Sequence, residues 1–244
     1  MGSCGLDHRW TPRHGGSVEL YEVMRTSAAV REFTDDPVPD DVVYGILDNA
    51  RFAPSGGNRQ GWRVILVKDP AIRAAVRDHY VMGFREYSAH LERGLVPFAP
   101  GDDGRWTGPA VDLEQARATP RSNDFADLLD RVPVMLVLCV DVTALAVLDN
   151  GLNRQSFVGG ASVYPFAHNI LLAARNEGLG GVVTTMLCRD EPAVKQLLGI
   201  PDPYALASLV ALGRPVRQVT HLRRLPVEEF TTVDTFDGPA FMVR

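Results

Sequence analysis

The stretch from Ala50 to Val67 constrains the fold most strongly, because it joins an amphipathic helix, a glycine-containing loop and an apolar strand. Residues 39–50 carry apolar side chains at helical spacing, which predicts a helix with one buried face. Pro54 and the pair Gly56 and Gly57 end this helix. Residues 64–67 are rich in β-branched side chains, which favours a strand. Since glycine has no Cβ, the loop between them can present bare main chain to a ligand.

The polar side chains of this loop are uncharged. Ser55, Asn58 and Gln60 offer neutral donors and acceptors, which suit the edge of a polar heterocycle or the hydroxyls of a sugar-like chain better than a metal ion. The alternative is a connection that contains glycine only to make its turn, and short loop motifs alone do not distinguish the two.

Length and charge limit the class of protein. A chain of 244 residues can form one sizeable domain or two small ones. The formal net charge of -5 argues against a nucleic-acid groove, which needs clustered basic charge. No apolar run approaches the length of a membrane span. Residues 1–16 lack the apolar centre of a secretory signal and are expected to form a flexible tail before a domain of residues 17–244.

Cysteine and histidine give no sign of a metal site. The three cysteines, Cys4, Cys139 and Cys188, cannot all pair, and the histidines are scattered. We therefore predict no bound metal and a reducing, cytoplasmic location. His168 falls off the apolar stripe of its predicted helix, and a structural role is favoured over a catalytic one because no partner is near in sequence.

The remaining pattern alternates helices and strands. Ser17 is expected to cap a helix that ends near Arg25, Asp69 and Pro70 to start another, and Asp190 to cap a short one. A long helix is predicted over residues 157–176. Strands are predicted at residues 132–140, the most apolar run and therefore central, and at residues 182–186 and 206–212.

Residues 81–122 lose this periodicity and contain Gly, Pro, Asp and isolated aromatic side chains. Long irregular segments in compact domains are typical of lids or binding loops. Phe84, Tyr87 and Trp106 are therefore candidates for stacking on an aromatic substrate, although surface packing is the alternative for each.

Two basic clusters suit an oxyanion. Arg25 and Arg31 lie near one predicted helix end, and Arg223 and Arg224 lie near the end of the sequence. Arginine offers a rigid fork of donors to phosphate, whereas the alternative for each cluster is solvated surface charge.

Four segments of the chain, spanning most of residues 25–230, resemble the FMN-dependent nitroreductase family. The loop matches through Pro54, Ser55, Gly56, Asn58, Gln60 and Trp62, and the first basic segment through Arg25, Ser27, Arg31, Phe33, Pro37 and Val38. The third match is Ala174, Arg175, Gly178, Leu179 and Gly180, and the fourth runs from Gly213 and Pro215 to Arg224 and Glu229. Two features depart from the commoner pattern: the wider spacing of Arg25 and Arg31, and Leu222 where a lysine is usual.

The resemblance implies an α+β fold, in which a mostly antiparallel or mixed sheet is flanked by helices. It also implies an intertwined homodimer whose extension, residues 226–244, wraps the partner, and FMN bound between the two chains. The implied FMN-binding residues are Arg25, Ser27, Arg31, Pro54, Ser55, Gly56, Asn58, Gln60, Val183, Thr184, Thr185, Arg223 and Arg224. The segment 81–122 corresponds to the family's lid, so Phe84, Tyr87 and Trp106 are the implied substrate-binding residues.

The implied activity is a ping-pong oxidoreductase reaction, in which NADPH or NADH gives a hydride to flavin N5 and a nitroaromatic or quinone accepts it. No catalytic side chain is required on the protein. Other reactions of this fold stay open, namely flavin fragmentation, dehalogenation and azoline oxidation. So do a non-catalytic FMN store and an unrelated α+β domain with a coincidental loop.

Overall fold

The computed structural model describes residues 18–243, so the predictions for residues 1–16 and Ser17 lie outside the described residues. At its centre is one antiparallel sheet with the strand order β1-β2-β4-β3. The strands are β1 (Trp62–Leu66), β2 (Val134–Asp141), β3 (Gly180–Thr184) and β4 (Tyr204–Gly213). The first residue of each strand lies within two positions of the predicted one. The apolar run at 132–140 forms a central strand, as predicted.

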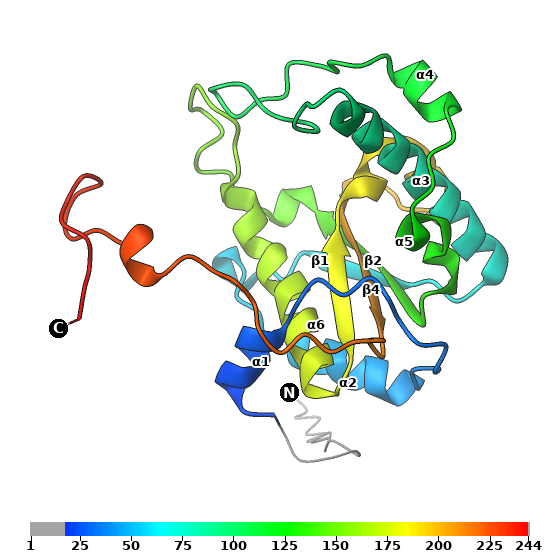
Figure 1. Ribbon diagram of the computed structural model, residues 1–244, viewed down its shortest axis with the longest axis horizontal. Helices are drawn as coiled ribbons and strands as arrows, with labels where there is room; N and C mark the ends of the chain where they lie inside the picture. The colour runs from blue at the N-terminus through cyan, green and yellow to red at the C-terminus, as the bar shows by residue number, and fades with distance from the viewer. Residues whose placement is uncertain (1–17, 244) are drawn as a thin grey trace, which may run out of the picture.

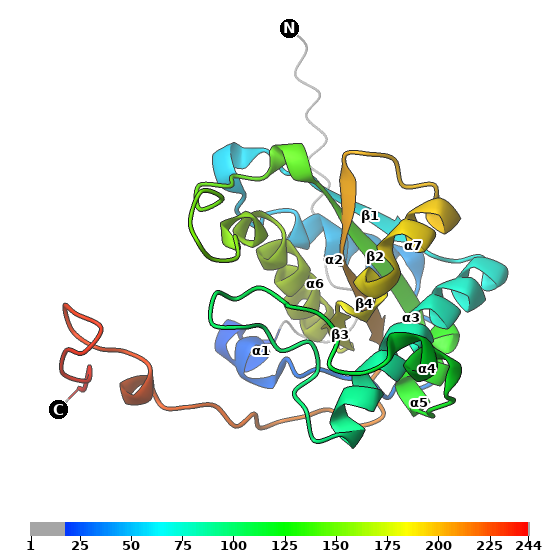
Figure 2. The same cartoon turned by 90° about the horizontal axis from the view of Figure 1, so that it is seen from above.

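Both faces of the sheet are covered by helices (Figures 1 and 2). Side chains at Leu136 and Leu138 pack with α2 (Asp40–Ala50) and α6 (Tyr164–Asn176) on one face. Met135 and Val137 pack on the opposite face with α3 (Pro70–Glu92) and α7 (Glu191–Leu198). This double covering explains the unbroken apolar run of β2, because neither of its two side-chain sets faces water.

The other helices are short: α1 (Leu20–Thr26), α4 (Leu113–Ala118) and α5 (Asp124–Asp127). Of the helices in residues 18–243, none combines the length and the apolar character needed to cross a bilayer.

Three local predictions are corrected by the structure. The long helix begins at Tyr164 rather than at residue 157, because residues 158–162 form a 3₁₀ turn and Pro165 occupies the first turn of α6. The region 81–122 is not irregular from its start, since α3 continues to Glu92. Asp190 lies at the N-terminus of α7, but its carboxylate contacts His79 Nδ1 at 2.6 Å and makes no capping hydrogen bond.

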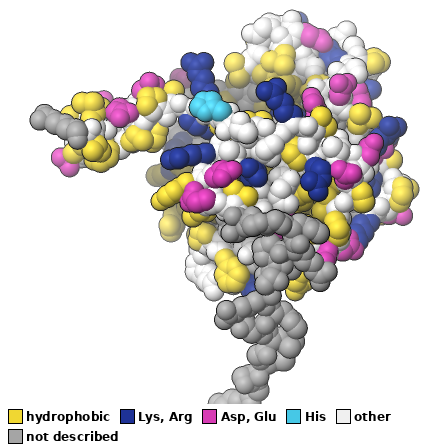
Figure 3. Space-filling view, turned by 60° about the horizontal axis from the view of Figure 1, so that its bottom comes forward, with side chains coloured by type: hydrophobic (Ala, Val, Ile, Leu, Met, Phe, Trp, Pro, Cys, Tyr) yellow, Lys and Arg dark blue, Asp and Glu magenta, His cyan; other side chains and the backbone are white. Residues whose placement is uncertain are grey.

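The chain beyond β4 first follows the body and then leaves it. Thr34 N donates to Arg214 O at 2.9 Å and Val216 N donates to Glu32 O at 3.1 Å. Gln218 Nε2 donates to Thr26 O at 3.2 Å, the last hydrogen bond that this segment makes to the body among the described residues. Residues 219–243, here called the arm, extend away from the body (Figures 1 and 2). Hydrophobic side chains are exposed along the arm (Figure 3), and Phe236 is 95% exposed.

Candidate functional site

The loop between α2 and β1 has a constrained backbone. Gly57 has φ +61°, and two non-glycine residues, Asn58 (φ 55°) and Gln60 (φ 49°), also adopt the left-handed region. Such conformations cost free energy and persist where the surroundings impose them. Here Ser55 Oγ accepts from Gln60 N at 3.0 Å, and Gly56 N donates to Ser162 Oγ at 3.0 Å. The loop is thereby fixed against the turn that precedes α6, and its Asn58 and Gln60 side chains face solvent.

The first basic segment lies against the other part of the predicted site. Ala29 forms a parallel bridge with Gly181, and Val30 N donates to Gly181 O at 2.9 Å. This approach requires glycine in β3, since a Cβ at Gly180 would lie 2.7 Å from Val30 Cγ2. The segment from Arg25 to Arg31 therefore runs beside the strand that carries Val183 and Thr184.

Tyr80 links α3 to β3, the strand beside this segment. Its hydroxyl lies 3.0 Å from Thr184 Oγ1, and its ring is buried. Burial raises the pKa of Tyr80, while its hydrogen bond with Thr184 and the charge of Arg31 oppose the rise. Arg31 thus lies within electrostatic range of Tyr80. The phenol is neutral at pH 7, and it was not identified from the sequence because nothing near Tyr80 in the chain marks it.

Two arginines in this region have no acidic partner. Within residues 18–243, neither Arg25 nor Arg31 forms an ion pair, and Arg25 lies over the ring of Tyr21 at 5.9 Å. Both side chains are exposed. Unpaired guanidiniums beside a strand edge are suited to a phosphate or another oxyanion.

Within one chain, the 54–60 loop and the Arg25–Arg31 segment lie far apart. The loop contacts Ser162 just before α6, whereas Thr26 Oγ1 accepts from Arg175 Nε at 2.9 Å near the end of α6. Because α6 has 13 residues, its ends are about 20 Å apart. Arg223 and Arg224 lie on the arm, where Arg224 Nη1 donates to Arg223 O at 2.8 Å.

The predicted substrate residues divide between two elements. Phe84 and Tyr87 both lie on α3, where their rings stack on each other with centroids 6.1 Å apart. Trp106 lies in residues 93–112, here called the 93–112 connection, between α3 and α4. Its ring contacts Phe98 at 6.0 Å and the guanidinium of Arg189 at 4.8 Å.

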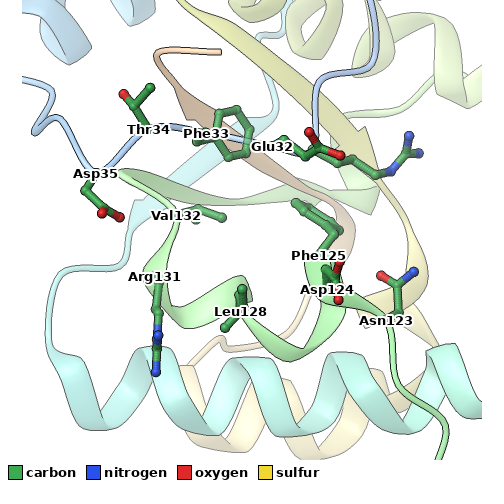
Figure 4. A pocket seen from close by; sticks show the side chains of 11 residues that line it. Glu32, Phe33, Thr34, Asp35, Asn123, Asp124, Phe125, Leu128, Arg131 and Val132 are labelled. Atoms are coloured by element: carbon green, nitrogen blue, oxygen red, sulfur yellow. The ribbon is translucent and has the colours of Figure 1, made fainter. Parts of the chain in front are cut away.

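A cavity of about 470 Å³ is lined in part by Arg31. Phe33 and Val132 face Phe125 and Leu128 across it (Figure 4). Tyr80 contacts Phe125 edge-on at 6.0 Å, so the cavity adjoins the group around Thr184. The 54–60 loop does not line the cavity. The cavity therefore adjoins only the part of the predicted site around Arg31 and Thr184.

Cys139, Cys188 and His168 are poorly placed to act in a nucleophilic mechanism. Burial raises the pKa of both Cys139 and Cys188 to about 11, so each thiol is protonated at neutral pH. His168 is exposed on α6.

The sequence model described as the Nitroreductase family matches residues 24–214, most of the chain. The chain belongs to the nitroreductase family. The match includes the 54–60 loop, the segment Arg25–Arg31 and β3, and it ends before Arg223 and Arg224.

Relatives of this nitroreductase-family protein carry different names. It is 31% identical over 205 residues to iodotyrosine deiodinase 1 of Rattus norvegicus, a match that covers 84% of this chain and 65% of the relative. The chain thus spans about two thirds of the length of the mammalian iodotyrosine deiodinases that it matches. It is 26% identical over 224 residues to nitrobenzene nitroreductase of Ectopseudomonas oleovorans, covering 86% of this chain and 95% of the relative.

Solved structures confirm the α+β fold of this nitroreductase-family chain. The NADPH:FMN oxidoreductase from Vibrio harveyi, complexed with NAD+, superposes with a TM-score of 0.60 at 20% identity. That superposition covers 89% of this chain and 78% of the other. The family prediction is therefore confirmed, as is the antiparallel sheet flanked by helices.

Proposed function

We propose that this protein is an FMN-dependent oxidoreductase that takes a hydride from NADPH or NADH and passes it to a nitroaromatic or quinone acceptor. The observation that carries the proposal is the pairing of the Arg25–Arg31 segment with β3, because the segment that carries these two arginines then runs alongside the strand of Val183 and Thr184. Bound FMN would supply the hydride chemistry, since its ring can accept a hydride from reduced nicotinamide and donate it to a second substrate.

The side chains of this protein fit such a cofactor at its charged end. Arg223 and Arg224 are assigned to the phosphate; of Arg25 and Arg31, one is assigned to the phosphate and the other to the pyrimidine edge of the ring, in either order. All four are exposed, and none has an acidic partner among the described residues. Charge-assisted hydrogen bonds from arginine to phosphate are strong and directional.

The protein also fits the cofactor at its planar end. Pro54, Ser55, Gly56, Asn58 and Gln60 are assigned to the edge of the ring, where amide groups can donate to its carbonyl oxygens and stabilise the negative charge of the reduced state. The fixed left-handed backbone at Gly57 and Asn58 keeps these groups oriented before the ligand arrives. Ser27 and the main chain of Val183, Thr184 and Thr185 are assigned to the neighbouring part of the site.

We propose that the complete site forms between two copies of the chain. The ends of α6 hold the loop and the Thr26 region about 20 Å apart, so a second copy is the way to bring an Asn58 loop to an Arg25–Arg31 segment. The arm supports the same arrangement, because Phe230, Phe236 and Met242 are too exposed for a monomer surface and suit burial against a partner.

Reductive deiodination of an aromatic substrate is the second candidate. It is favoured by the 31% identity to the rat deiodinase, which exceeds the 26% identity to the nitrobenzene nitroreductase. The two reactions share the flavin and differ in the acceptor, so the same experiment distinguishes them.

The test begins with the purified protein. We expect a yellow protein, or a colourless one that becomes yellow when reconstituted with FMN. Under anaerobic conditions, stopped-flow mixing with NADPH and with NADH should bleach the flavin absorbance. Subsequent mixing with nitrobenzene, a benzoquinone and iodotyrosine should restore the colour fastest with the preferred acceptor. A protein that cannot be reconstituted with FMN would contradict the proposal, and a flavin that no nicotinamide bleaches would indicate a store.

A further inference from the structure

One face of α3 runs along the end of β3 and the segment that follows it, with a contact at each helical turn. Tyr80 contacts Thr184 at 3.0 Å. One turn later, a Cβ at Gly83 would lie 2.8 Å from the carbonyl oxygen of Met186. A further turn along, Glu86 Oε2 accepts from Arg189 Nε at 2.9 Å. Because residues three apart share a helix face, α3 is held in register with residues 184–189.

Glu86 is the centre of a buried ion cluster. The residue is 0% exposed, and its second oxygen accepts from Arg117 Nε at 2.5 Å. A carboxylate this deeply buried is tolerated when both oxygens are paired, and losing one arginine would leave one buried oxygen without a hydrogen bond. The cluster therefore joins α3, α4 and the segment after β3.

Arg189 also holds the 93–112 connection. Its guanidinium lies 5.1 Å from the ring centre of Phe98 and 4.8 Å from that of Trp106. Such cation–π contacts are stronger when the cation is partly desolvated, and the Arg189 side chain keeps only 27% of its surface exposed. Trp106 keeps 37% of its surface exposed, so its ring is anchored by the arginine while part of it stays available to a ligand.

We propose that Arg189 is a positioning residue, which holds Trp106 as a stacking platform for a flat, electron-poor aromatic acceptor at a place set by the end of β3. This inference rests on the proposed function, because Thr184 and Thr185 are the residues assigned to the flavin. The electron-rich face of an indole favours stacking with an electron-poor ring. Arg189 is the fourth residue after Thr185, so a shift of Arg189 would move the platform relative to the cofactor.

The first variant is Arg189→Lys. Lysine keeps the positive charge for Glu86 but loses the planar fork that lies over the two rings. We expect the connection to open more often, so trypsin should cleave after Arg93 and Arg105 about fivefold faster, a factor typical of one lost cation–π contact. The fragments are identified by mass spectrometry, and the measurement needs no bound flavin.

Steady-state kinetics supply the second readout. In Arg189→Lys and in Trp106→Leu we expect KM for the aromatic acceptor to rise about fivefold, while the rate of flavin reduction by nicotinamide stays unchanged. The double variant should be no worse than either single one, because both remove the same contact.

Arg121→Lys is the matched control. Arg121 binds Glu92 of α3 through two hydrogen bonds of 2.7 Å, but it contacts no aromatic ring among the described residues. It should leave tryptic cleavage at Arg93 and Arg105 and the acceptor KM unchanged.

The inference is overturned if Arg189→Lys leaves cleavage at the wild-type rate, or if acceptor KM and the flavin-reduction rate change by the same factor. If Arg189→Lys fails to fold, Trp106→Leu alone decides, because Trp106 lies in a surface connection. A protein without flavin would instead overturn the proposed function, while the cleavage assay would still show whether Arg189 anchors the connection.

Discussion

At Gly83 the backbone of α3 passes so close to Met186 that a side chain would lie only 2.8 Å from its carbonyl oxygen. Glycine inside a helix ordinarily costs about 0.5–1 kcal/mol relative to alanine. Here the missing Cβ permits the contact that keeps Tyr80 and Glu86 against Thr184 and Arg189. A single unfavourable helix residue thus sets the distance between α3 and the candidate site.

Replacing Gly83 with alanine is therefore expected to destabilise the fold, against the usual direction of this change. The clash is with main chain, so we expect a loss of about 1–3 kcal/mol in the free energy of unfolding. Urea unfolding followed by circular dichroism measures it. Ser88→Ala on the same helix is the control and should stay within about 0.5 kcal/mol of wild type. A stabilised Gly83→Ala protein would contradict the close packing.

Arg224 offers a second test at the scale of one side chain. Arg224→Ala should weaken FMN binding by about 1.5–3 kcal/mol, because it removes a charge-assisted bond to the phosphate. Flavin retained after desalting, and titration of the apoprotein, measure the change. Arg63→Ala is the control, since exposed Arg63 lies over the ring of Tyr204 instead. Equal flavin retention by both variants would count against the assignment.

At the scale of elements, the loop between β2 and α6 is organised by one acidic residue. Asp149 is buried and accepts hydrogen bonds from Arg154, Ser156 Oγ and Phe157 N. These bonds hold the pKa of Asp149 well below its usual range. The same loop reaches the 93–112 connection, because Gln155 N donates to Asp103 O at 2.9 Å. Asp149 therefore stabilises one support of that connection.

The lowered pKa gives a pH dependence of defined sign. Since the folded protein favours the ionised form, Asp149 contributes its full stability above the ordinary carboxyl pKa of about 3.9 and loses it as pH falls toward the lower, folded value. Asp149→Asn should lower Tm at pH 7, and the difference from wild type should shrink below about pH 4. Asp102→Asn, in an exposed turn, is the control. A Tm difference that does not change with pH would contradict this role.

The elements themselves were largely predictable. Strands and the α2 and α6 stripes follow from apolar periodicity, because burial against the sheet imposes it. The second half of α3 could not be predicted from apolar periodicity, because its buried positions include Gly83, Glu86 and His90, which are not apolar. The start of α6 was misplaced because the apolar stripe continues into a 3₁₀ turn that periodicity does not separate from α-helix.

At the scale of the whole molecule, the candidate residues were found through a resemblance and their grouping came from the structure. Sequence reasoning missed Glu86 and Arg189 because 103 residues separate them, and no local pattern indicates that a carboxylate and a guanidinium will meet. Ser162 and Tyr80 were missed for the same reason. The loop and the arginine segment lie near opposite ends of α6, so one chain alone does not place them in the same site.

Mixed assemblies test whether two chains share each site. Neither Asn58→Asp nor Arg31→Glu protein should retain flavin, because each places a negative charge in every site. After the two are unfolded, mixed in equal amounts and refolded, about a quarter of the sites should be intact, since half of the dimers are mixed and each has one unaltered site. Flavin absorbance per chain measures this, with each variant refolded alone as the control. No recovery in the mixture would contradict a shared site.

The position of the arm in the chain has a consequence for how the protein is made. β4 completes the sheet, and residues 219–243 leave the ribosome only after it. The exposed hydrophobic side chains of the arm therefore follow every strand of the sheet in the order of synthesis. Phe230 and Phe236 lie outside the core of a single copy, so each newly made chain presents them to solvent.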